Sequence, residues 1–226
     1  MTDNQDLLKS TSVQNFLKSV YSLQQRMERV STNSLADALN ISAPSVTDMA
    51  QRLEEAQLLD YQKYRGVVLT LAGEQMALKI IRRHRLIELY LVEELGYELS
   101  EVHDEAEDLE HAVSDRFIEA LAIKLDHPLV DPHGDPIPAE DGTITRRELS
   151  PLTDWPLHTP ATVSRIKATS AEMLQHILER DFKLAAQVEV LARDPFDGPV
   201  TIRLDAHEQV IGHNVAACIL VEPPLE

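Results

Sequence analysis

Apolar positions recur with helical spacing through the first third of the chain. In residues 11–29 they fall three or four residues apart, which places them on one face of a helix: Val13, Phe16, Leu17, Val20 and Leu23. Ser31-Thr32 can cap a second helix, and Ser42 can cap a third with Pro44 in its first turn. The pattern predicts two short helices joined by a tight turn, which is typical of helix-turn-helix.

A hairpin is predicted next, because LLDYQKY and VVLT flank Arg65-Gly66. Helix-turn-helix followed by a basic-tipped hairpin indicates a winged helix, and the alternative is a generic helical bundle with a hairpin. The exposed face of the third helix and the hairpin tip supply the expected DNA contacts: Ser42, Pro44, Ser45, Thr47, Asp48, Gln51, Lys63 and Arg65. The two basic residues would meet phosphates. Asp48 can accept a hydrogen bond from cytosine N4, although it would repel phosphate.

Helical periodicity continues in the middle of the chain. Thr70 can cap a long helix to about Leu95, and Ser100 can cap an acidic helix that runs to about Leu125. Long helices with apolar stripes often pack on a twin, so we expect a homodimer.

The pattern changes after this helical part. Residues 126–159 are dense in Pro, Gly and Asp and predict a linker or an irregular crossing, with His127 and His133 at the surface. From Pro160 onward, short strand-like runs interrupted by one helix (171–180) predict a small β-barrel. Cys218 lies in the apolar run VAACILV and is expected to be a buried strand residue.

Charge and composition narrow the class of protein. The 226 residues carry a formal net charge of −17, but acids and bases nearly cancel up to Thr70. Residues 101–120 hold eight acids against one base, so the acidic excess does not exclude a DNA-binding N-terminal part. A single cysteine, a polar N-terminus and the lack of a long apolar run predict a cytoplasmic protein without a membrane segment.

The acidic helix carries candidate metal ligands. His103, Glu107, Glu110 and His111 fall on one stripe of a helix, and His84 and Glu88 have the same one-turn spacing on the helix before it. Bringing these groups together is costly unless a positive charge lies between them, which a divalent metal provides. The alternative interpretation is a solvated acidic face with incidental histidines.

Several segments together resemble the diphtheria-toxin-repressor/manganese-transport-regulator family of metal-dependent transcriptional repressors. They are NFLKSVYSLQ, ISAPSVTDMAQRLEEAQLL, KYRGVVLT, RRHRLIELYL, VHDEAEDLEHAVSD and PHGDPIP. The resemblance implies a mainly α protein with a C-terminal all-β domain. Its expected parts are a winged helix-turn-helix (1–72), a helical metal-binding and dimerisation domain (73–145), a linker (146–159) and an SH3-like domain (160–226).

The resemblance also implies the ligand sets. One site would use His84, Glu88 and His103, and the other would use Glu107, Glu110 and His111. Position 107 is cysteine in the iron-sensing branch and glutamate in the manganese-sensing branch, so Glu107 favours Mn²⁺, with Fe²⁺, Co²⁺, Zn²⁺ and Cd²⁺ as alternatives.

Four further positions depart from the family's ligand pattern or match it only in part. Asn15 stands where the manganese branch has an aspartate, and it can still coordinate through its side-chain oxygen. Lys18 replaces a second carboxylate, which favours two separated sites over a closely bridged pair. Glu172 and Gln175 have the spacing of barrel ligands in the long members, but matching the strands without a gap puts Arg165 and Ala168 there. We therefore expect neither Glu172 nor Gln175 to be a ligand.

Together with the ligand pattern, the resemblance implies a metal-dependent repressor of metal-ion homeostasis that binds a palindromic operator as a dimer, without a small organic substrate. A di-metal carboxylate enzyme in a helical bundle would need Glu-x-x-His on two helices. Here Asp108 precedes His111 by three residues, and His84 precedes its glutamate, so we expect no enzyme. A third possibility is a winged-helix regulator whose acidic helix binds a protein or a small ligand.

Overall fold

The computed structural model describes residues 7, 10–168 and 170–224, and the chain forms two compact units. The first unit consists of Met1–His84, Glu107–Ala120 and Pro138–Ile144, and the second of Arg85–Ala106, Leu121–Ile137 and Thr145–Glu226. Within the described residues, every helix is too short or too polar to span a lipid bilayer.

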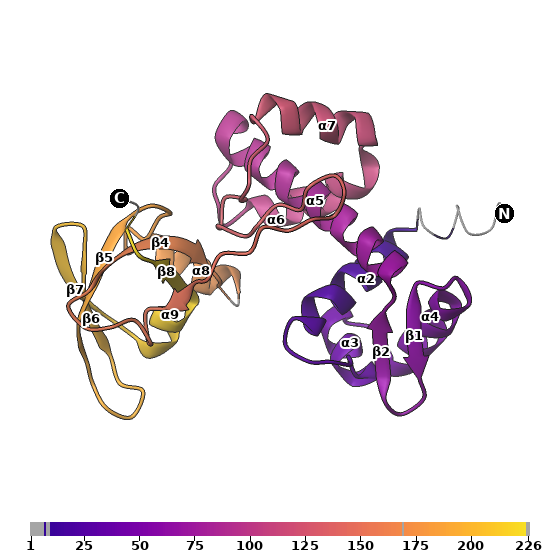
Figure 1. The fold of residues 1–226 in the computed structure, drawn as a ribbon, viewed down its shortest axis with the longest axis horizontal. Coiled ribbons are helices and arrows are strands. Elements are labelled where there is room, and N and C mark those ends of the chain that lie inside the picture. The colour runs from indigo at the N-terminus through magenta and orange to yellow at the C-terminus, as the bar shows by residue number, and fades with distance from the viewer. Residues whose placement is uncertain (1–6, 8–9, 169, 225–226) are drawn as a thin grey trace. The chain divides into compact units, whose positions relative to one another are not determined.

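Three helices and a hairpin form the N-terminal part of the first unit (Figure 1). They are α2 (Thr11–Gln24), α3 (Thr32–Leu39), α4 (Ala43–Glu55), β1 (Leu59–Gln62) and β2 (Gly66–Leu69). The Ser31 hydroxyl caps α3 by accepting from the Ser34 N–H at 3.0 Å, and Asn40 ends this helix with a left-handed φ of 51°. The Ser42 hydroxyl caps α4 in the same way. The predicted helix-turn-helix is confirmed.

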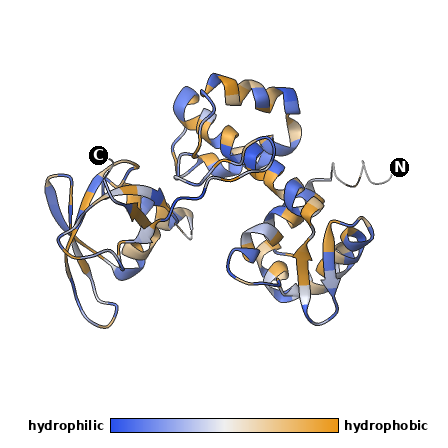
Figure 2. Ribbon diagram, viewed as in Figure 1, coloured by the Kyte–Doolittle hydropathy of each residue, from blue (hydrophilic) through white to orange (hydrophobic). Residues whose placement is uncertain are grey.

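The hairpin packs closely against the segment after α2. Gly66 has a φ of +94°, and a Cβ there would lie 2.1 Å from the carbonyl oxygen of Val30. Val30 and Val67 exchange two backbone hydrogen bonds of 2.9 Å. A side chain at position 66 would therefore push the hairpin away from the helices. β2 is mostly hydrophobic, whereas the turn before it is hydrophilic (Figure 2).

One hydrophobic core joins these elements to the start of the next helix. Phe16, Leu17, Leu35 and Leu53 are fully buried, and each contributes about 1.5–3 kcal/mol relative to an exposed side chain. Ile81 belongs to the same core. The first turns of α5 (Leu71–Leu95) are thereby fixed to the winged helix.

The acidic segment forms two helices rather than one. α6 (Val102–Ala112) and α7 (Asp115–Lys124) replace the single helix expected as far as Leu125. That prediction is wrong because Ser114 starts a new helix: its hydroxyl accepts from the Phe117 N–H at 3.2 Å. The long helix before it begins as expected, since the Thr70 hydroxyl accepts from the Gly73 N–H at 3.1 Å.

The second unit contains a six-stranded antiparallel sheet of order β3-β8-β4-β5-β6-β7. Its elements are β3 (Ser150–Pro151), β4 (Pro160–Ile166), α8 (Ala171–Leu178), β5 (Gln187–Arg193), β6 (Val200–Leu204), β7 (His207–Ile211), α9 (His213–Cys218) and β8 (Ile219–Glu222). Phe182, Ile202 and Ile219 are fully buried in its core. The predicted fold class, helical with a C-terminal β domain, is confirmed.

Two local predictions about this region are wrong. Cys218 is buried as expected, but it is the last residue of α9 rather than a strand residue. The apolar run VAACILV changes from helix to strand at Ile219, and apolarity alone does not reveal such a change. β3 also lies inside the segment expected to be irregular, where Ser150 pairs with Val221.

Candidate metal centre and nucleic-acid interface

Helix α2 meets helix α6 through polar side chains in the first unit. The Gln14 Oε1 atom lies 2.6 Å from Nδ1 of His111. One turn later on α2, Lys18 Nζ donates to Glu110 at 2.8 Å and also to Glu107. A helix of the winged helix therefore contacts three of the expected metal ligands.

Helices α2 and α6 each carry a buried polar atom of a kind that binds divalent cations. Asn15 Oδ1 and His111 Nε2 are buried and have no hydrogen-bond partner among the described residues. A proton on Nδ1 of His111, donated to the Gln14 amide oxygen, would leave a lone pair on Nε2 for a metal. Burial lowers the pKa of the His111 imidazole, which favours the neutral form, while Glu110 opposes this shift. A neutral imidazole, an amide oxygen and carboxylates match the ligands that Mn²⁺ or Fe²⁺ accepts.

Glu110 is fully buried and uses both carboxylate oxygens. Its Oε1 accepts from Lys18 and lies 3.3 Å from Nε2 of His111, and its Oε2 lies 2.6 Å from Nδ1 of His84. These partners offset the cost of removing a carboxylate from water. His84, Glu107 and Glu110 offer ligand atoms that all lie within 4.8 Å of one another.

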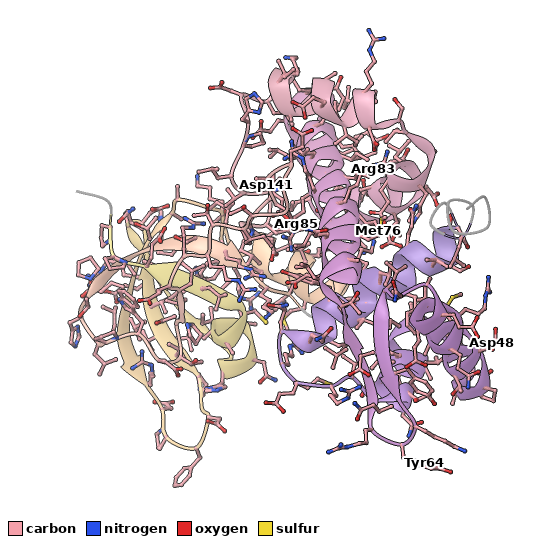
Figure 3. All side chains as sticks on the ribbon, turned by 45° about the vertical axis from the view of Figure 1, so that its right-hand side comes forward. Asp48, Tyr64, Met76, Arg83, Arg85 and Asp141 are labelled. Carbon is pink, nitrogen blue, oxygen red and sulfur yellow. The ribbon has the colours of Figure 1, made fainter. Side chains whose placement is uncertain are left out.

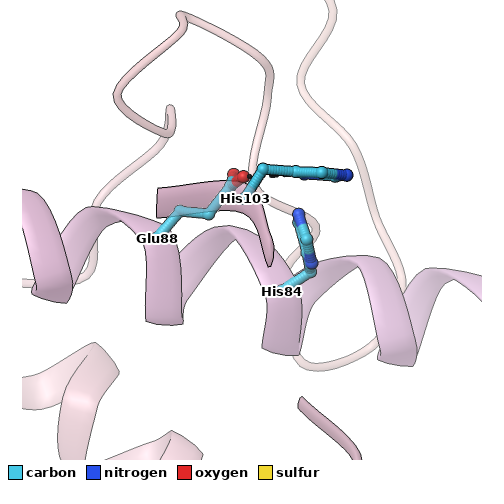
Figure 4. A group of neighbouring side chains, drawn as sticks. All are labelled: His84, Glu88 and His103. Carbon is cyan, nitrogen blue, oxygen red and sulfur yellow. Dashed lines mark hydrogen bonds and ion pairs between the residues drawn. The ribbon is translucent and has the colours of Figure 1, made fainter. Parts of the chain in front are cut away.

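His84 also belongs to a second group with Glu88 and His103 (Figure 4). His84 and Glu88 lie one turn apart on α5, and His103 comes from the first turn of α6. The three offer ligand atoms within 4.8 Å, and Nδ1 of His103 lies 3.3 Å from Oε1 of the buried Glu88. The structure thus brings together His84, Glu88 and His103 as one expected site. The other expected set is met only in part, because Glu107 and Glu110 group with His84, while His111 lies outside that group at 3.3 Å from Glu110. Metal binding by either group stays a prediction.

A loop of the second unit brings a further histidine to Glu88. Nε2 of His133 lies 3.9 Å from Oε1 of Glu88, and the His133 side chain is only 17% exposed. The expectation that His133 is a surface residue is therefore wrong, whereas His127 is exposed as expected. The sequence signal was the DPHGD turn, whose glycine and aspartates allow a folded loop rather than a free linker.

The buried carboxylate of Asp131 organises this loop. It accepts from the N–H groups of His133 and Asp135, both at 2.9 Å. Burial and the neighbouring Asp135 raise the pKa of Asp131 to about 7, while Arg85 acts in the opposite direction. Gly134 then passes directly against β4, where a Cβ would lie 2.1 Å from the Ser164 carbonyl oxygen. The histidine is therefore held between the helices and the sheet of this unit.

The two residues with the spacing of barrel ligands lie on α8. Glu172 and Gln175 are both exposed. Gln175 donates to Glu179 at 3.2 Å, and a hydrogen bond with Ser170 lowers the pKa of Glu172. Arg165, which stands at the position matched without a gap, pairs with Asp135. That neither α8 residue is a ligand stays a prediction.

Helix α4 presents the polar face expected of a DNA-reading helix. Its exposed candidates are Ser42, Pro44, Ser45, Asp48 and Gln51. The Thr47 hydroxyl is half-buried and donates to the Ala43 carbonyl at 3.1 Å. Figure 3 shows Asp48 on the outer side of α4. The contacts with bases stay a prediction.

The hairpin tip presents an aromatic residue between two basic ones. Lys63 and Arg65 are exposed, and Tyr64 is 93% exposed at the tip with a φ of 67° (Figure 3). Lys63 Nζ lies 5.1 Å from the centre of the Tyr64 ring. Sequence analysis missed Tyr64, although its place between the two basic residues of a turn was a usable signal. An exposed phenol there can donate to a phosphate oxygen beside the two cations.

Three family models match consecutive parts of the chain. Residues 9–67 match the iron dependent repressor N-terminal DNA binding domain, and residues 70–139 match the iron dependent repressor metal binding and dimerisation domain. Residues 150–223 match the FeoA domain.

Curated relatives and solved structures match the chain over about half to nearly all of its length. The iron-dependent repressor IdeR of Mycobacterium leprae is 28% identical over 233 residues, covering 96% of this chain and 98% of the relative. The transcriptional regulator MntR of Oceanobacillus iheyensis is 34% identical over 107 residues, covering 47% of this chain and 72% of the relative. The solved structure of a manganese-dependent transcriptional repressor in complex with manganese has a TM-score of 0.86 and 37% identity, covering 94% of this chain and 100% of the other.

Proposed function

Because the chain belongs to the diphtheria-toxin-repressor/manganese-transport-regulator family of metal-dependent DNA-binding repressors, we propose that it responds to manganese. It is a repressor and not an enzyme, and its domains imply operator DNA and a second copy of the chain as partners. We propose further that the dimer binds a palindromic operator and acts in the cytoplasm, beside the chromosome.

Glu107 supports manganese as the metal. It shares a ligand group with Glu110 and His84, so the group is rich in carboxylate oxygens. Mn²⁺ binds weakly in the general order of divalent metals, and oxygen ligands favour it relative to the softer metals that thiolate selects. Fe²⁺ is the main competitor, because carboxylate and imidazole also suit it; Co²⁺, Zn²⁺ and Cd²⁺ are the further alternatives.

The observation that carries the proposal is the meeting of α2 and α6. Asn15 lies on α2 within the winged helix, whereas Glu107, Glu110 and His111 lie on α6. A bound divalent cation would supply positive charge shared by both helices. Asn15 and His111 would bind it through Oδ1 and Nε2, two buried atoms that have no hydrogen-bond partner among the residues that the structure describes.

This arrangement links metal binding to the position of α4, the proposed DNA-contacting helix, through the hydrophobic core of the winged helix. α2 packs with α3 and α4 in one hydrophobic cluster, so fixing α2 against α6 also fixes α4. In a homodimer, the spacing of the two α4 helices decides whether both enter successive major grooves of a palindrome. We propose that Asn15, Glu107, Glu110 and His111 set this spacing, and that metal and operator affinity are linked.

The proposal is tested by measuring operator binding of the full chain with Mn²⁺ and with EDTA, together with metal analysis of the purified protein. We expect tight binding with Mn²⁺ and loss of binding with EDTA, restored by adding the metal. Equal operator affinity under both conditions would rule out metal-dependent binding. Anaerobic titration with Mn²⁺ and Fe²⁺ then decides the metal, because activation by Fe²⁺ at clearly lower concentration would replace manganese by iron.

A further inference from the structure

We propose that Lys18 competes with the metal for Glu107 and Glu110, and so sets the metal concentration at which this centre fills. The inference rests on the proposed metal centre of α2 and α6. Lys18 Nζ donates to Glu110 at 2.8 Å and also to Glu107. One ammonium group therefore binds two of the carboxylates proposed as ligands.

These ion pairs are stronger than ordinary surface pairs. The Lys18 side chain is 19% exposed, and Glu110 is fully buried. Charges that are partly withdrawn from water attract each other more than exposed ones, and breaking such a pair leaves a poorly hydrated carboxylate. The ammonium group thus stabilises the contact between α2 and α6 through positive charge.

The lysine and a metal compete for the same two carboxylates. A ligand oxygen lies about 2.2 Å from the Mn²⁺ that it binds. An ammonium nitrogen that donates to the same oxygen lies within about 3 Å of that oxygen. Two cations so close repel each other strongly in a partly buried site. Lys18 must therefore turn toward solvent, which its flexible stem and partial exposure allow.

Metal binding at this centre is thus an exchange of one cation for another. The free energy of the two ion pairs is subtracted from the free energy of metal binding, so Lys18 weakens the measured affinity. It also prevents the carboxylates from repelling each other when they hold no metal. The centre then fills above a threshold concentration instead of retaining its metal permanently, which suits a sensor.

The test replaces Lys18 by methionine, which has similar length but no charge, in a His103→Ala background that disables the other ligand group. The matched control is Lys79→Met. Lys79 is another lysine of the first unit that pairs with a carboxylate, since its Nζ lies 2.8 Å from Asp115, which is not a proposed ligand. Bound Mn²⁺ is measured from the loss of the free-ion signal in electron paramagnetic resonance.

We expect Lys18→Met to lower the Kd for Mn²⁺ roughly tenfold, because one partly buried competitor is lost. Without metal, its Tm should fall by about 2–4 °C relative to the background. With saturating Mn²⁺, this difference should shrink or reverse. Lys79→Met should leave the Kd for Mn²⁺ unchanged.

Lys18→Arg tests the same idea in the opposite direction. Its guanidinium keeps the charge and can bind carboxylates through two parallel hydrogen bonds. The Kd for Mn²⁺ should therefore equal or exceed the Kd measured with Lys18 in the same background. This variant decides the question if Lys18→Met does not fold.

Two outcomes would overturn the inference: weaker or unchanged Mn²⁺ binding by Lys18→Met, or tighter binding by Lys18→Arg. His111→Ala in the same background separates this failure from failure of the metal centre itself. If His111→Ala weakens Mn²⁺ binding while Lys18→Met has no effect, the centre is correct and the lysine is not a competitor. If His111→Ala has no effect either, the proposed centre is wrong.

Discussion

The two groups of candidate ligands share His84 but differ in what surrounds their carboxylates. Glu107 and Glu110 already hold the ammonium of Lys18, whereas Glu88 faces the imidazoles of His103 and His133. An imidazole can be neutral and lend a lone pair to a metal, but an ammonium can only leave. The comparison shows that the affinity of each proposed centre for a metal depends on two things. One is the set of ligands, and the other is the groups that the metal must displace from them.

The groups also differ in their balance of oxygen and nitrogen. Two carboxylates and His84 make up the first, and one carboxylate with two histidines makes up the second. Nitrogen-rich sites suit zinc, copper, iron and nickel, whereas oxygen-rich sites suit manganese and magnesium. We therefore expect the oxygen-rich group to decide the metal response and the nitrogen-rich group to modulate it.

The largest effect is expected from Glu110→Gln. This change removes the carboxylate that both Lys18 and His84 contact, so it disturbs both groups at once. Operator affinity in the presence of Mn²⁺ should fall by at least about 100-fold, because loss of a ligand costs no less than loss of a group that orients one. The measurement is a DNA-shift titration at fixed Mn²⁺.

Asp108→Asn is the matched control for that change, because Asp108 lies on the same helix but is exposed. It should leave operator affinity within about twofold, as surface substitutions usually do. Retention of nearly full metal-dependent affinity by Glu110→Gln would show that Glu110 is structural only.

Glu107→Cys should change which metal activates the protein. A thiolate in place of a hard oxygen favours softer metals, so the order should shift toward Fe²⁺, Co²⁺ or Zn²⁺. The Mn²⁺ concentration needed for operator binding should rise roughly tenfold, within the range for loss of a preferred ligand. Anaerobic titration of operator binding with each metal measures this.

Glu107→Ala serves as the reference for that experiment, since it removes the ligand without offering another. It should weaken activation by every metal. An unchanged order of metals in Glu107→Cys would mean that residue 107 does not select the metal.

His103→Ala should have a smaller effect, because it affects only the nitrogen-rich group. We expect a loss of about three- to tenfold in operator affinity at limiting Mn²⁺, with binding recovered at high Mn²⁺. His127→Ala is the control, since His127 is an exposed histidine outside both groups. Complete and irreversible loss of activation in His103→Ala would contradict the division of roles.

The smallest change is expected from Arg65→Ala, which touches neither group. Loss of one phosphate contact should weaken binding to all DNA sequences about equally and lower the salt slope by roughly one unit. The Mn²⁺ concentration for half-maximal binding should stay the same. A changed base preference with an unchanged salt slope would contradict the assignment of the hairpin tip to phosphates.

Helical spacing predicted most of the candidate ligands, because residues one turn apart share a face whatever the rest of the protein does. It placed His84 with Glu88, and His103 with the residues that follow it on the acidic helix. It did not reveal which side chains of another helix face them. In the sequence, Lys18 stands out only as a missing ligand, whereas its pairing with Glu107 and Glu110 is a property of the folded chain.

The fold class could also be predicted from the sequence, but the ends of some helices could not. The caps at Ser31, Ser42 and Thr70 were predicted because a hydroxyl before an apolar period has a clear physical role. Ser114 has the same role inside a helical pattern, where periodicity continues on both sides and hides the break. His133 was misjudged because its position depends on a buried Asp131 and a glycine pressed against β4, which are long-range contacts.

The two oxygens of Glu110 have a consequence for the steepness of the response. One faces Lys18 and His111, and the other lies 2.6 Å from Nδ1 of His84, a residue that belongs to both groups. Metal binding that fixes Glu110 in one group therefore also fixes His84 for the other group. Such coupling between two binding sites is reciprocal. Occupancy of the two groups should then rise together, with a Hill coefficient above one, so that a modest change in cellular metal would switch transcription instead of grading it.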